Sequence, residues 1–378
     1  MSRPISRTPD VVATRLRNQG LVGSSFRRAE DVVARLGAVQ AQDYAGARWA
    51  LGQRVKGATD QIVRQAFDDG RILRTHVLRP TWHFVTPADL RWMLSVTAPR
   101  VHAANGFSYR ANGLDTKTLT RGADVVCRAL EGGRHLTRAE LATALARRRL
   151  PSEGQALAYV VMHAELEGLI CSGPVRGKQF TYALVNERVP QTPALGADEA
   201  LAALAVRYFS SHGPATLRDF VWWSGLTVAQ ARAAIDGCDR GLAAISLDGR
   251  QHWWTPGAAP RSSTAPPRVY LLPNYDEFLI AFKDRHWTTA PSTAAPRFGP
   301  AAGHPHQLLI EGLVEGAWRR TLSASTVTVE VVPYRALTPR EREGLYDAVD
   351  RYSAFLGLPA TLRIAPPAQA AGVARPGV

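Results

Sequence analysis

Two glutamines separated by one alanine, Gln40 and Gln42 in the segment VQAQDY, are the residues whose type and spacing best suit chemistry. A primary amide donates and accepts hydrogen bonds but does not ionise, so the pair suits a site that holds a water molecule against an already activated substrate. On a helix the two side chains would point about 200° apart, so packing of one helix face does not explain why both residues are glutamine. We therefore expect an extended or loop segment at the end of a helix, which aims both amides into one cleft.

The elements that must position this pair follow an order that is clearest between Leu119 and Leu184. Three helical patterns come first, and two short strands follow them. Thr137 and Glu140 have the spacing of a capping box at the start of the middle helix. Three helices followed by a hairpin are typical of a winged helix-turn-helix unit.

The same order recurs on both sides of this segment. Between Ala197 and Thr255, Thr216 and Asp219 repeat the helix cap, and Asp248-Gly249 predicts a hairpin turn. Between Pro9 and Thr86 the copy is less regular, with helices expected over 10–19, 28–39 and 60–70 and strands over 72–80 and 81–86. The glutamine pair follows the second of these helices, and a helix over 90–114 joins this copy to the next.

Beyond Pro256 the composition changes to a turn-rich linker, GAAPRSSTAPP, followed by short alternating segments that read as strands. Thr338 caps a last helix. We therefore predict an α+β fold of three tandem winged helix-turn-helix units plus a C-terminal β-rich domain. Its parts are 1–114 (first unit with the glutamine pair and the connecting helix), 115–192 (second unit), 193–258 (third unit), 259–366 (β-rich domain with terminal helix) and 367–378 (disordered tail).

The charge balance favours a polyanionic partner. The chain has 46 Lys and Arg against 32 Asp and Glu, a net charge of +14 and a pI of about 10.3. Nucleic acid is the most plausible partner for such a chain. No apolar run approaches the roughly 18–20 residues of a membrane span, and the N-terminus lacks a signal-peptide pattern, so we expect a cytoplasmic protein.

Neither a metal nor a cofactor is expected from the sequence. Cys127, Cys171 and Cys238 are far apart without a C-x-x-C spacing, so they read as small buried thiols. His304 and His306 lie in a Pro/Gly-rich segment without a nearby Cys or carboxylate, which is a weak metal motif. The absence of an acidic magnesium cluster and of a Gly-rich phosphate loop disfavours nucleases and NTPases.

Four segments, taken in order, resemble the AlkZ/YcaQ-type winged-helix DNA glycosylases. They are VQAQDY at 39–44, RTHVLRPTWHFVTPADL at 74–90, LLPNYDEFLIAFKDR at 271–285 and LIEGLVEGAWRR at 309–320. The resemblance implies three tandem winged helices around a concave DNA channel. It also implies removal of N7-alkylated guanine from double-stranded DNA, including guanine in an interstrand crosslink. Gln40 and Gln42 match the family's Gln-x-Gln motif, and Asp43 comes one place too late for the alternative Gln-x-Asp motif.

The chemistry of such a lesion suits neutral amides. N7-alkylation leaves guanine cationic and a good leaving group, so the enzyme must mainly guide water onto an oxocarbenium-like sugar. We expect the side-chain carbonyl of Gln42 to accept a hydrogen bond from the attacking water, and Gln40 to help hold the water or the sugar–phosphate. None of the four lysines is next to the pair in sequence, so we expect simple hydrolysis without lyase activity. The lesion could be a crosslink or a bulky natural-product adduct, met in repair or in self-resistance to a toxin.

Other residues are weaker candidates for DNA contact. His83 reads either as a half-buried structural histidine or as a pocket residue, and Arg74 and Arg79 read as surface charge or as phosphate contacts. Arg147, Arg148 and Arg149 end the second helix of the second unit, where phosphate binding is favoured over a solvated face.

Purely structural roles for some residues and two alternative functions stay open. Trp222-Trp223 and Trp253-Trp254 read as core packing rather than as base-stacking platforms, because one of each pair should point inward. Asp276-Glu277 is interpreted as a structural pair in a strand that contacts an arginine such as Arg285. The rival function is a non-catalytic winged-helix regulator, but three unequal copies favour a monomeric clamp over half of a symmetric dimer. An RNA-binding module is disfavoured because RNP-like aromatic strands are absent.

Overall fold

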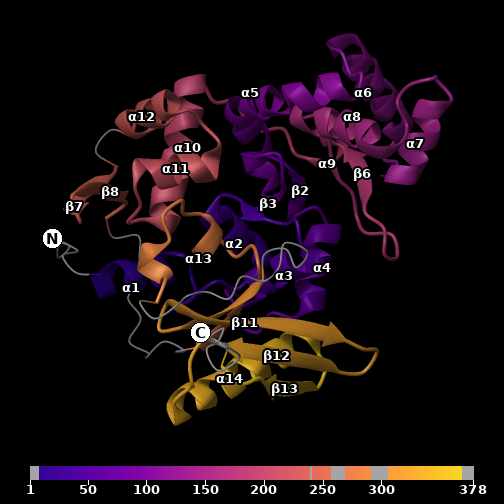
Figure 1. Ribbon diagram of the computed structural model, residues 1–378. Coiled ribbons are helices and arrows are strands. Elements are labelled where there is room, and N and C mark those ends of the chain that lie inside the picture. Colours follow the sequence, from indigo (N-terminus) through magenta and orange to yellow (C-terminus); the bar gives the residue numbers. More distant parts are fainter. Residues whose placement is uncertain (1–7, 239–240, 257–268, 291–304, 368–378) are drawn as a thin grey trace, which may run out of the picture.

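The structure, a computed structural model, describes residues 8–238, 241–256, 269–290 and 305–367. Within these residues helices alternate with four β-sheets (Figure 1). The predicted mixture of helices and strands is confirmed. The linker predicted at 257–267 and the tail at 368–378 lie outside the described residues.

One order of elements occurs three times along the chain. In the first copy it is α2 (Ala29–Leu36), β1 (Val39–Gln40), α3 (Tyr44–Gly52), α4 (Asp60–Asp68), β2 (Leu73–His76) and β3 (Trp82–Val85). The second copy is α6 (Thr116–Leu130), β4 (Leu136–Thr137), α7 (Arg138–Ala146), α8 (Gly154–Leu166), β5 (Ile170–Ser172) and β6 (Thr181–Leu184), followed by α9 (Val185–Arg188). Their sheets have the matching orders β1-β3-β2 and β4-β6-β5. The glutamine motif therefore begins on the short first strand of its unit.

The third copy consists of α10 (Ala197–His212), α11 (Leu217–Ser224), α12 (Val228–Asp236), β7 (Ala243–Leu247) and β8 (Arg250–Trp254). A single bridge between Ala215 and Trp253 takes the place of its first strand. The predicted hairpin turn is present, because Leu247 pairs with Arg250 and both turn residues have positive φ, 49° at Asp248 and 70° at Gly249.

The helix caps that the spacing predicted are also present. Thr137 and Glu140 form the capping box of α7, and Thr216 and Asp219 form that of α11. Thr338 caps α14 (Pro339–Leu356) in the same way. Satisfying the free N–H groups of the first turn is the physical reason why these helices begin where they do.

The helices of the first copy differ from the prediction. The first predicted helix, α1 (Thr8–Asn18), packs against α10 and the short helix η1 (His286–Thr288). The middle helix of the unit is α3, which the pattern did not indicate. The sequence of α3, YAGARWALG, is buried on most of its circumference, so it lacks the apolar periodicity of a surface helix. Asp43 caps α3 by accepting from the N–H of Gly46 at 3.0 Å.

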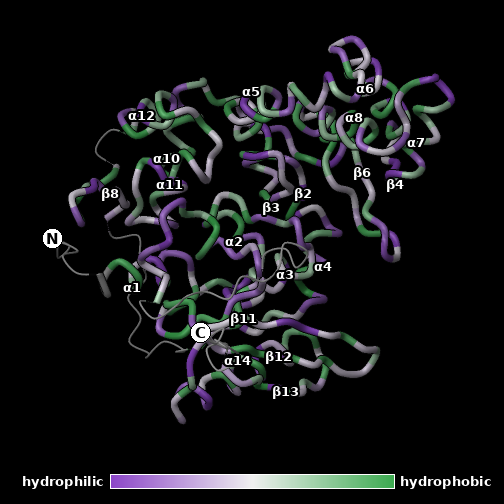
Figure 2. The backbone as a smooth tube through the Cα atoms, in the orientation of Figure 1, coloured by the Kyte–Doolittle hydropathy of each residue, from purple (hydrophilic) through white to green (hydrophobic). Residues whose placement is uncertain are grey.

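Helix α5 (Pro87–Ala111) connects the first copy to the second and packs between α10 and α8 (Figure 1). A proline at its first position suits a helix start, where the N–H has no partner. Figure 2 shows hydrophobic and hydrophilic residues alternating along it. Among the described residues, no helix combines the length and the apolar character that crossing a membrane requires.

The C-terminal part forms one five-stranded sheet of order β13-β12-β11-β10-β9. Its elements are β9 (Val269–Leu272), α13 (Glu277–Ile280), β10 (His306–Ile310), β11 (Leu313–Leu322), β12 (Val327–Pro333), α14 and β13 (Ala360–Ile364). The strand predicted through residues 268–282 is wrong in its second half, where the chain turns after Leu272 and Asp276 caps α13. Strand β13, which pairs in parallel with β12, was not predicted.

This sheet and the first unit share one hydrophobic core. The ring of Trp49 in α3 lies 4.9 Å from that of Tyr352 in α14, and its indole N–H donates to the carbonyl of Leu271 at 2.7 Å. The buried guanidinium of Arg54 bonds both carboxylate oxygens of Asp276, at 2.8 and 2.7 Å. These contacts fix α13 against the unit that carries the glutamine pair.

Candidate active site

Gln40 lies on the edge strand of the first sheet, directly opposite His83 of β3. His83 in turn lies opposite Thr75 of β2. Residues directly opposite each other in antiparallel strands share a face, so these three side chains lie on one face of the sheet. The segment is extended, as the sequence analysis expected, and Gln40 is 8% exposed.

The side-chain amide of Gln40 is held by Arg79. The Nη2 of Arg79 donates to Oε1 of Gln40 across 3.0 Å. Because a guanidinium only donates, this contact fixes which end of the amide is the carbonyl. Arg79 also lies 5.8 Å from the ring centre of Trp222, over which Lys283 Nζ lies at 4.5 Å. The Trp222 ring is 38% exposed, so this cationic and aromatic group reaches the surface.

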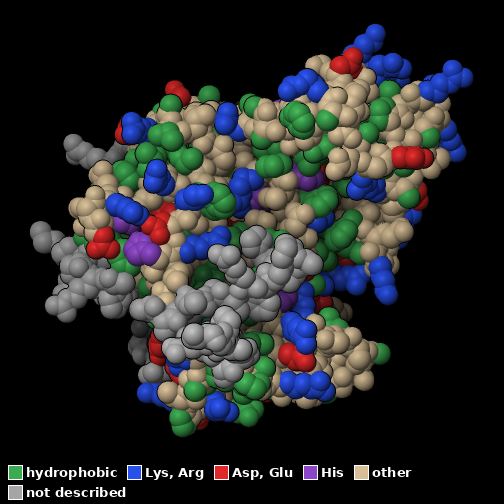
Figure 3. Space-filling model, viewed as in Figure 1, with side chains coloured by type: hydrophobic (Ala, Val, Ile, Leu, Met, Phe, Trp, Pro, Cys, Tyr) green, Lys and Arg blue, Asp and Glu red, His purple; other side chains and the backbone are tan. Residues whose placement is uncertain are grey.

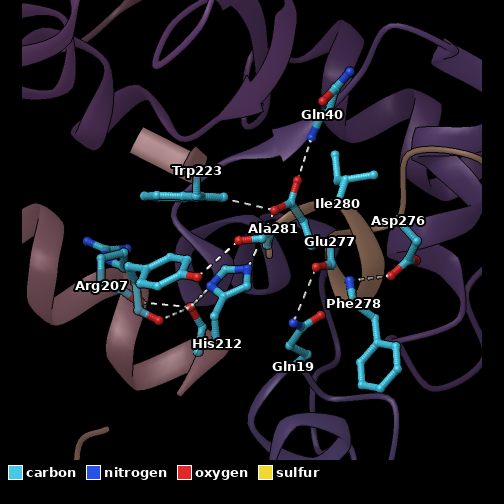
Figure 4. Close-up of polar contacts among 12 residues, drawn as sticks. Gln19, Gln40, Arg207, His212, Trp223, Asp276, Glu277, Phe278, Ile280 and Ala281 are labelled. Atoms are coloured by element: carbon cyan, nitrogen blue, oxygen red, sulfur yellow. Dashed lines mark hydrogen bonds and ion pairs between the residues drawn. The ribbon is translucent and has the colours of Figure 1, made fainter. Parts of the chain in front are cut away.

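The backbone of Gln40 is held from another part of the chain by Glu277. The N–H of Gln40 donates to Oε1 of Glu277 at 2.9 Å, and the indole N–H of Trp223 donates to Oε2 at 3.0 Å (Figure 4). His212 Nε2 lies 3.5 Å from the same Oε2, and burial lowers the pKa of His212. Glu277 is 1% exposed, so its carboxylate is taken up by protein donors rather than by water.

Gln42 lies in the bend between β1 and α3, and its side chain is exposed. Its amide makes no hydrogen bond to another residue that the structure describes. The neighbouring carboxylate of Asp43 is engaged, because it accepts from Gly46 and forms an ion pair with Arg320 at 3.2 Å. The two glutamines therefore differ: one is oriented and nearly buried, and the other faces solvent.

His83 is fully buried beneath the pair. Its Nδ1 lies 2.9 Å from the carbonyl of Thr81, so Nδ1 carries the proton that it donates, and Nε2 is buried without a hydrogen-bond partner. Burial, with the nearby charge of Arg79, holds the pKa of His83 well below its usual value. His83 is thus a neutral imidazole that does not reach the surface on which DNA would lie.

Arg74 belongs to the opposite face of the sheet, because it lies across from Phe84. Its Nε donates to the carbonyl of Ala41 at 3.0 Å, and its guanidinium lies between the rings of Trp82 and Phe180, at 4.2 and 4.6 Å. It therefore braces the peptide between the two glutamines. A cavity of about 680 Å³ lies on this face; its lining includes Arg74, Trp82, Arg138, Lys178, Phe180 and Tyr182.

The three remaining predicted DNA contacts are exposed. Arg147, Arg148 and Arg149 follow α7. Figure 3 shows Lys and Arg side chains over the end of the molecule where Figure 1 draws α6 and α7. These arginines belong to a different unit from the glutamine pair.

The sequence analysis missed how Glu277 contributes to the site. It assigned Asp276 and Glu277 to a strand, with Arg285 as a possible partner, whereas Asp276 pairs with Arg54 and Glu277 holds the first unit. The only available signal was the adjacent tryptophan pair: Trp223 is fully buried, as expected of one member, and it is a donor to Glu277. His304 lies outside the described residues, and His306 Nδ1 accepts from the N–H of Asn274.

Comparisons with known proteins give the family and the fold of the chain. The profile of the family described as AlkZ-like DNA glycosylase matches residues 33–355. An interstrand DNA cross-link repair glycosylase from Streptomyces sahachiroi is 26% identical over 326 residues, which are 82% of this chain and 86% of that protein. The solved structure of the Streptomyces sahachiroi DNA glycosylase AlkZ is similar in fold, with a TM-score of 0.77 and 24% identity over 96% of this chain and 100% of that one.

The family match spans both the glutamine motif on β1 and the Glu277 segment that holds it. The chain therefore belongs to the AlkZ-like family of DNA glycosylases.

Proposed function

We propose that this protein is a monofunctional DNA glycosylase that hydrolyses the N-glycosidic bond of N7-alkylguanine in double-stranded DNA. Crosslinked guanine and bulky adducts are included, because the curated relative is named for interstrand cross-link repair. The observation that carries the proposal is the Gln40-Ala41-Gln42 segment, which runs from the edge strand β1 into a bend and in which one amide is oriented and the other is exposed.

Gln42 positions the attacking water. Its exposed carbonyl accepts a hydrogen bond from water and places a negative dipole beside the developing positive charge on the sugar. Gln40 has its carbonyl on Arg79, so its remaining amide donors are directed by that bond toward the water or the sugar–phosphate. Arg79 keeps its cationic charge close to a phosphate of the lesion strand.

The neighbouring carboxylates support the restriction to charged lesions. Asp43 is engaged by Gly46 and Arg320, and Glu277 is buried among protein donors. Neither is placed to activate water as a general base, so the reaction depends on a base that is already a good leaving group. Lys283 shares the Trp222 ring with Arg79, and its ammonium group lies 4.5 Å from the centre of that ring, with no hydrogen bond to either glutamine among the described residues. This arrangement supports hydrolysis without lyase activity.

The three repeated units act as winged helices that line one DNA channel, closed by the C-terminal sheet, in a monomer. The identical strand orders of the first two units and the net charge of +14 support this arrangement. His83 and Arg74, which face away from solvent or into packed rings, act by positioning the glutamine segment. Arg147, Arg148 and Arg149 contact phosphates.

The test uses duplex DNA with a single N7-methylguanine or a nitrogen-mustard crosslink, followed by alkali to cleave abasic sites. We expect strand breaks with the wild-type protein and a loss of at least about a hundredfold in rate with Gln42→Ala at unchanged DNA affinity. Gln191→Ala, which removes an exposed loop glutamine, is the matched control. Equal rates for Gln42→Ala and wild type would remove Gln42 from the mechanism.

The rival function, a winged-helix regulator without catalysis, predicts DNA binding but no breaks on any cationic adduct. A second variant, Gln42→Glu, separates the chemistry from the binding. A carboxylate at this position can act as a base, so it should add activity on DNA containing neutral uracil that the wild type lacks.

A further inference from the structure

A second group of chemically competent side chains lies between the connecting helix and the second unit. His102 belongs to α5, and His163 belongs to α8, which packs against α5. Glu167 directly follows α8, four residues after His163. Glu165, which lies between His163 and Glu167, bonds His76 of β2 at 2.6 Å, so the group lies beside the first sheet. Among the described residues, none of its three side chains bonds Gln40, Gln42, Arg79 or Glu277, so the group is not part of the proposed glycosylase site.

The donor atoms of these three residues converge. His102 Nε2, His163 Nδ1 and a carboxylate oxygen of Glu167 all lie within 4.8 Å of one another. The distance from His102 Nε2 to Glu167 Oε1 is 3.1 Å, and that from His163 Nδ1 to the same oxygen is 4.0 Å. Ligands about 2.0–2.2 Å from a tetrahedral ion lie about 3.4 Å apart, so small side-chain rotations complete the site.

Both ring nitrogens lack a hydrogen bond to the part of the protein that the structure describes. His102 Nε2 and His163 Nδ1 are buried atoms without a hydrogen bond among the described residues. The carboxylate is close to His102 Nε2, but the contact does not have the geometry of a hydrogen bond. A buried polar atom without a hydrogen bond destabilises the folded chain, so an ion that binds these two nitrogens removes that penalty.

A second layer of contacts orients the first ligand. His102 Nδ1 lies 3.0 Å from the hydroxyl of Tyr109, one of whose ring neighbours is Tyr159 of α8, at 5.5 Å between centres. When Nδ1 donates to this hydroxyl, Nε2 presents its lone pair toward Glu167. A hydrogen bond on the far nitrogen is the usual support of a metal-bound histidine.

We propose that His102, His163 and Glu167 form a binding site for one divalent transition-metal ion, with Zn²⁺ as the best match. Two imidazole nitrogens and one carboxylate are ligands that Zn²⁺ accepts, and the half-exposed Glu167 leaves room for water as a fourth ligand. The ion clamps the second unit to α5. The sequence analysis expected no metal, and it did not consider these two histidines, which are far apart in the chain.

The test titrates ZnCl2 into the full-length chain after EDTA treatment, with bound metal measured by mass spectrometry and stability by thermal unfolding. We expect one Zn²⁺ per chain and a saturable rise of a few degrees in the melting temperature. His163→Ala should abolish both, and Glu167→Gln, which preserves shape and removes charge, should weaken binding at least about tenfold. His135→Ala, at an exposed histidine of the same unit, should change neither.

The proposal is overturned if the wild type binds no Zn²⁺ at 100-fold excess. It is also overturned if Glu167→Gln and His163→Ala bind as the wild type does. Each variant's melting temperature in EDTA shows whether it is folded, so a loss of binding is not mistaken for unfolding. None of these outcomes depends on the glycosylase proposal.

Discussion

The peptide N–H of Gln40 donates to the carboxylate of Glu277, which lies 237 residues later in the chain, across 2.9 Å (Figure 4). The same carboxylate accepts from Trp223 of the third copy. Glu277 thus joins the strand that carries the catalytic candidate to two other parts of the molecule. Its geometry assigns it a positioning role, since both oxygens are engaged and no substrate can reach them.

Replacing Glu277 with Ala should therefore reduce both stability and rate. The variant leaves the N–H of Gln40 and the indole N–H of Trp223 buried without acceptors, at about 1–3 kcal/mol each. Urea unfolding measures the first effect, and single-turnover base release measures the second. Glu343→Ala, at an exposed position of α14, is the control. A Glu277→Ala variant as stable and as active as the wild type would contradict the positioning role of this carboxylate.

Arg79 should control how well Gln40 is oriented. Arg79→Lys keeps a positive charge but loses the planar donor that reaches Oε1 of Gln40, so we expect the single-turnover rate to fall roughly ten- to hundredfold with DNA affinity nearly unchanged. Arg79→Ala should lower the affinity as well. The rate is measured on N7-methylguanine DNA and the affinity by fluorescence anisotropy at fixed salt. If Arg79→Lys loses affinity and keeps its rate, Arg79 contacts phosphate only.

His306 makes the stability of the C-terminal sheet sensitive to acid. Burial, followed by the charge of Arg320, lowers the pKa of His306 to about 4, and its Nδ1 must stay unprotonated to accept from Asn274. Above the ordinary pKa of about 6.5 both folded and unfolded chains carry a neutral ring, so this group has no effect there. Between pH 6.5 and about 4 only the unfolded chain takes up the proton, so stability falls as the pH falls.

Urea unfolding at pH 7 and pH 5 measures this loss. His306→Gln, which cannot be protonated, should lose less stability over that interval than the wild type. The difference in slope should be at most about 1.4 kcal/mol per pH unit, the effect of one proton. Burial also lowers the pKa of other histidines, such as His83 and His212, so they too destabilise the folded protein as the pH falls. His306→Gln should therefore reduce the slope of stability against pH without abolishing it. An unchanged slope would exclude His306.

The parts of the fold that the sequence predicted are those with local causes. Helix starts were predicted at Thr137, Thr216 and Thr338, because a capping side chain acts within the first turn of its own helix. A hairpin was predicted at Asp248-Gly249, because both residues adopt positive φ. Helix α3 was missed because it is buried on most sides and has no periodicity to detect.

In the candidate site, too, the sequence predicted local features but not long-range contacts. The motif of Gln40 and Gln42 was predicted from residue type and spacing together with the family resemblance of the surrounding segments. An extended or loop backbone was expected there, because successive residues of a helix are rotated by 100°. The partner of Gln40 could not be read, because Glu277 and Arg79 reach it through contacts that depend on how separate units pack. The His102–His163–Glu167 group could not be predicted either, because its residues meet only when separate helices pack together.

The exposed arginines after α7 give the clearest test of where DNA lies. Arg147→Ala combined with Arg148→Ala should weaken binding to damaged and undamaged duplexes equally, because phosphate contacts carry no sequence or lesion information. Losing two such contacts should make the plot of log K against log salt shallower by up to about 1.8. Arg149 is left unchanged because its φ of 56° makes its backbone conformation sensitive to substitution.

The matched control is Arg340→Ala combined with Arg342→Ala on α14, which removes the same charge from exposed positions on a different part of the molecule. Affinity is measured by fluorescence anisotropy between 50 and 200 mM salt, the range over which the counterion effect is large. If both double variants change the slope equally, the effect follows from net charge alone and the second unit has no special place on DNA. If only the α7 pair changes it, DNA crosses the second unit at the end of α7.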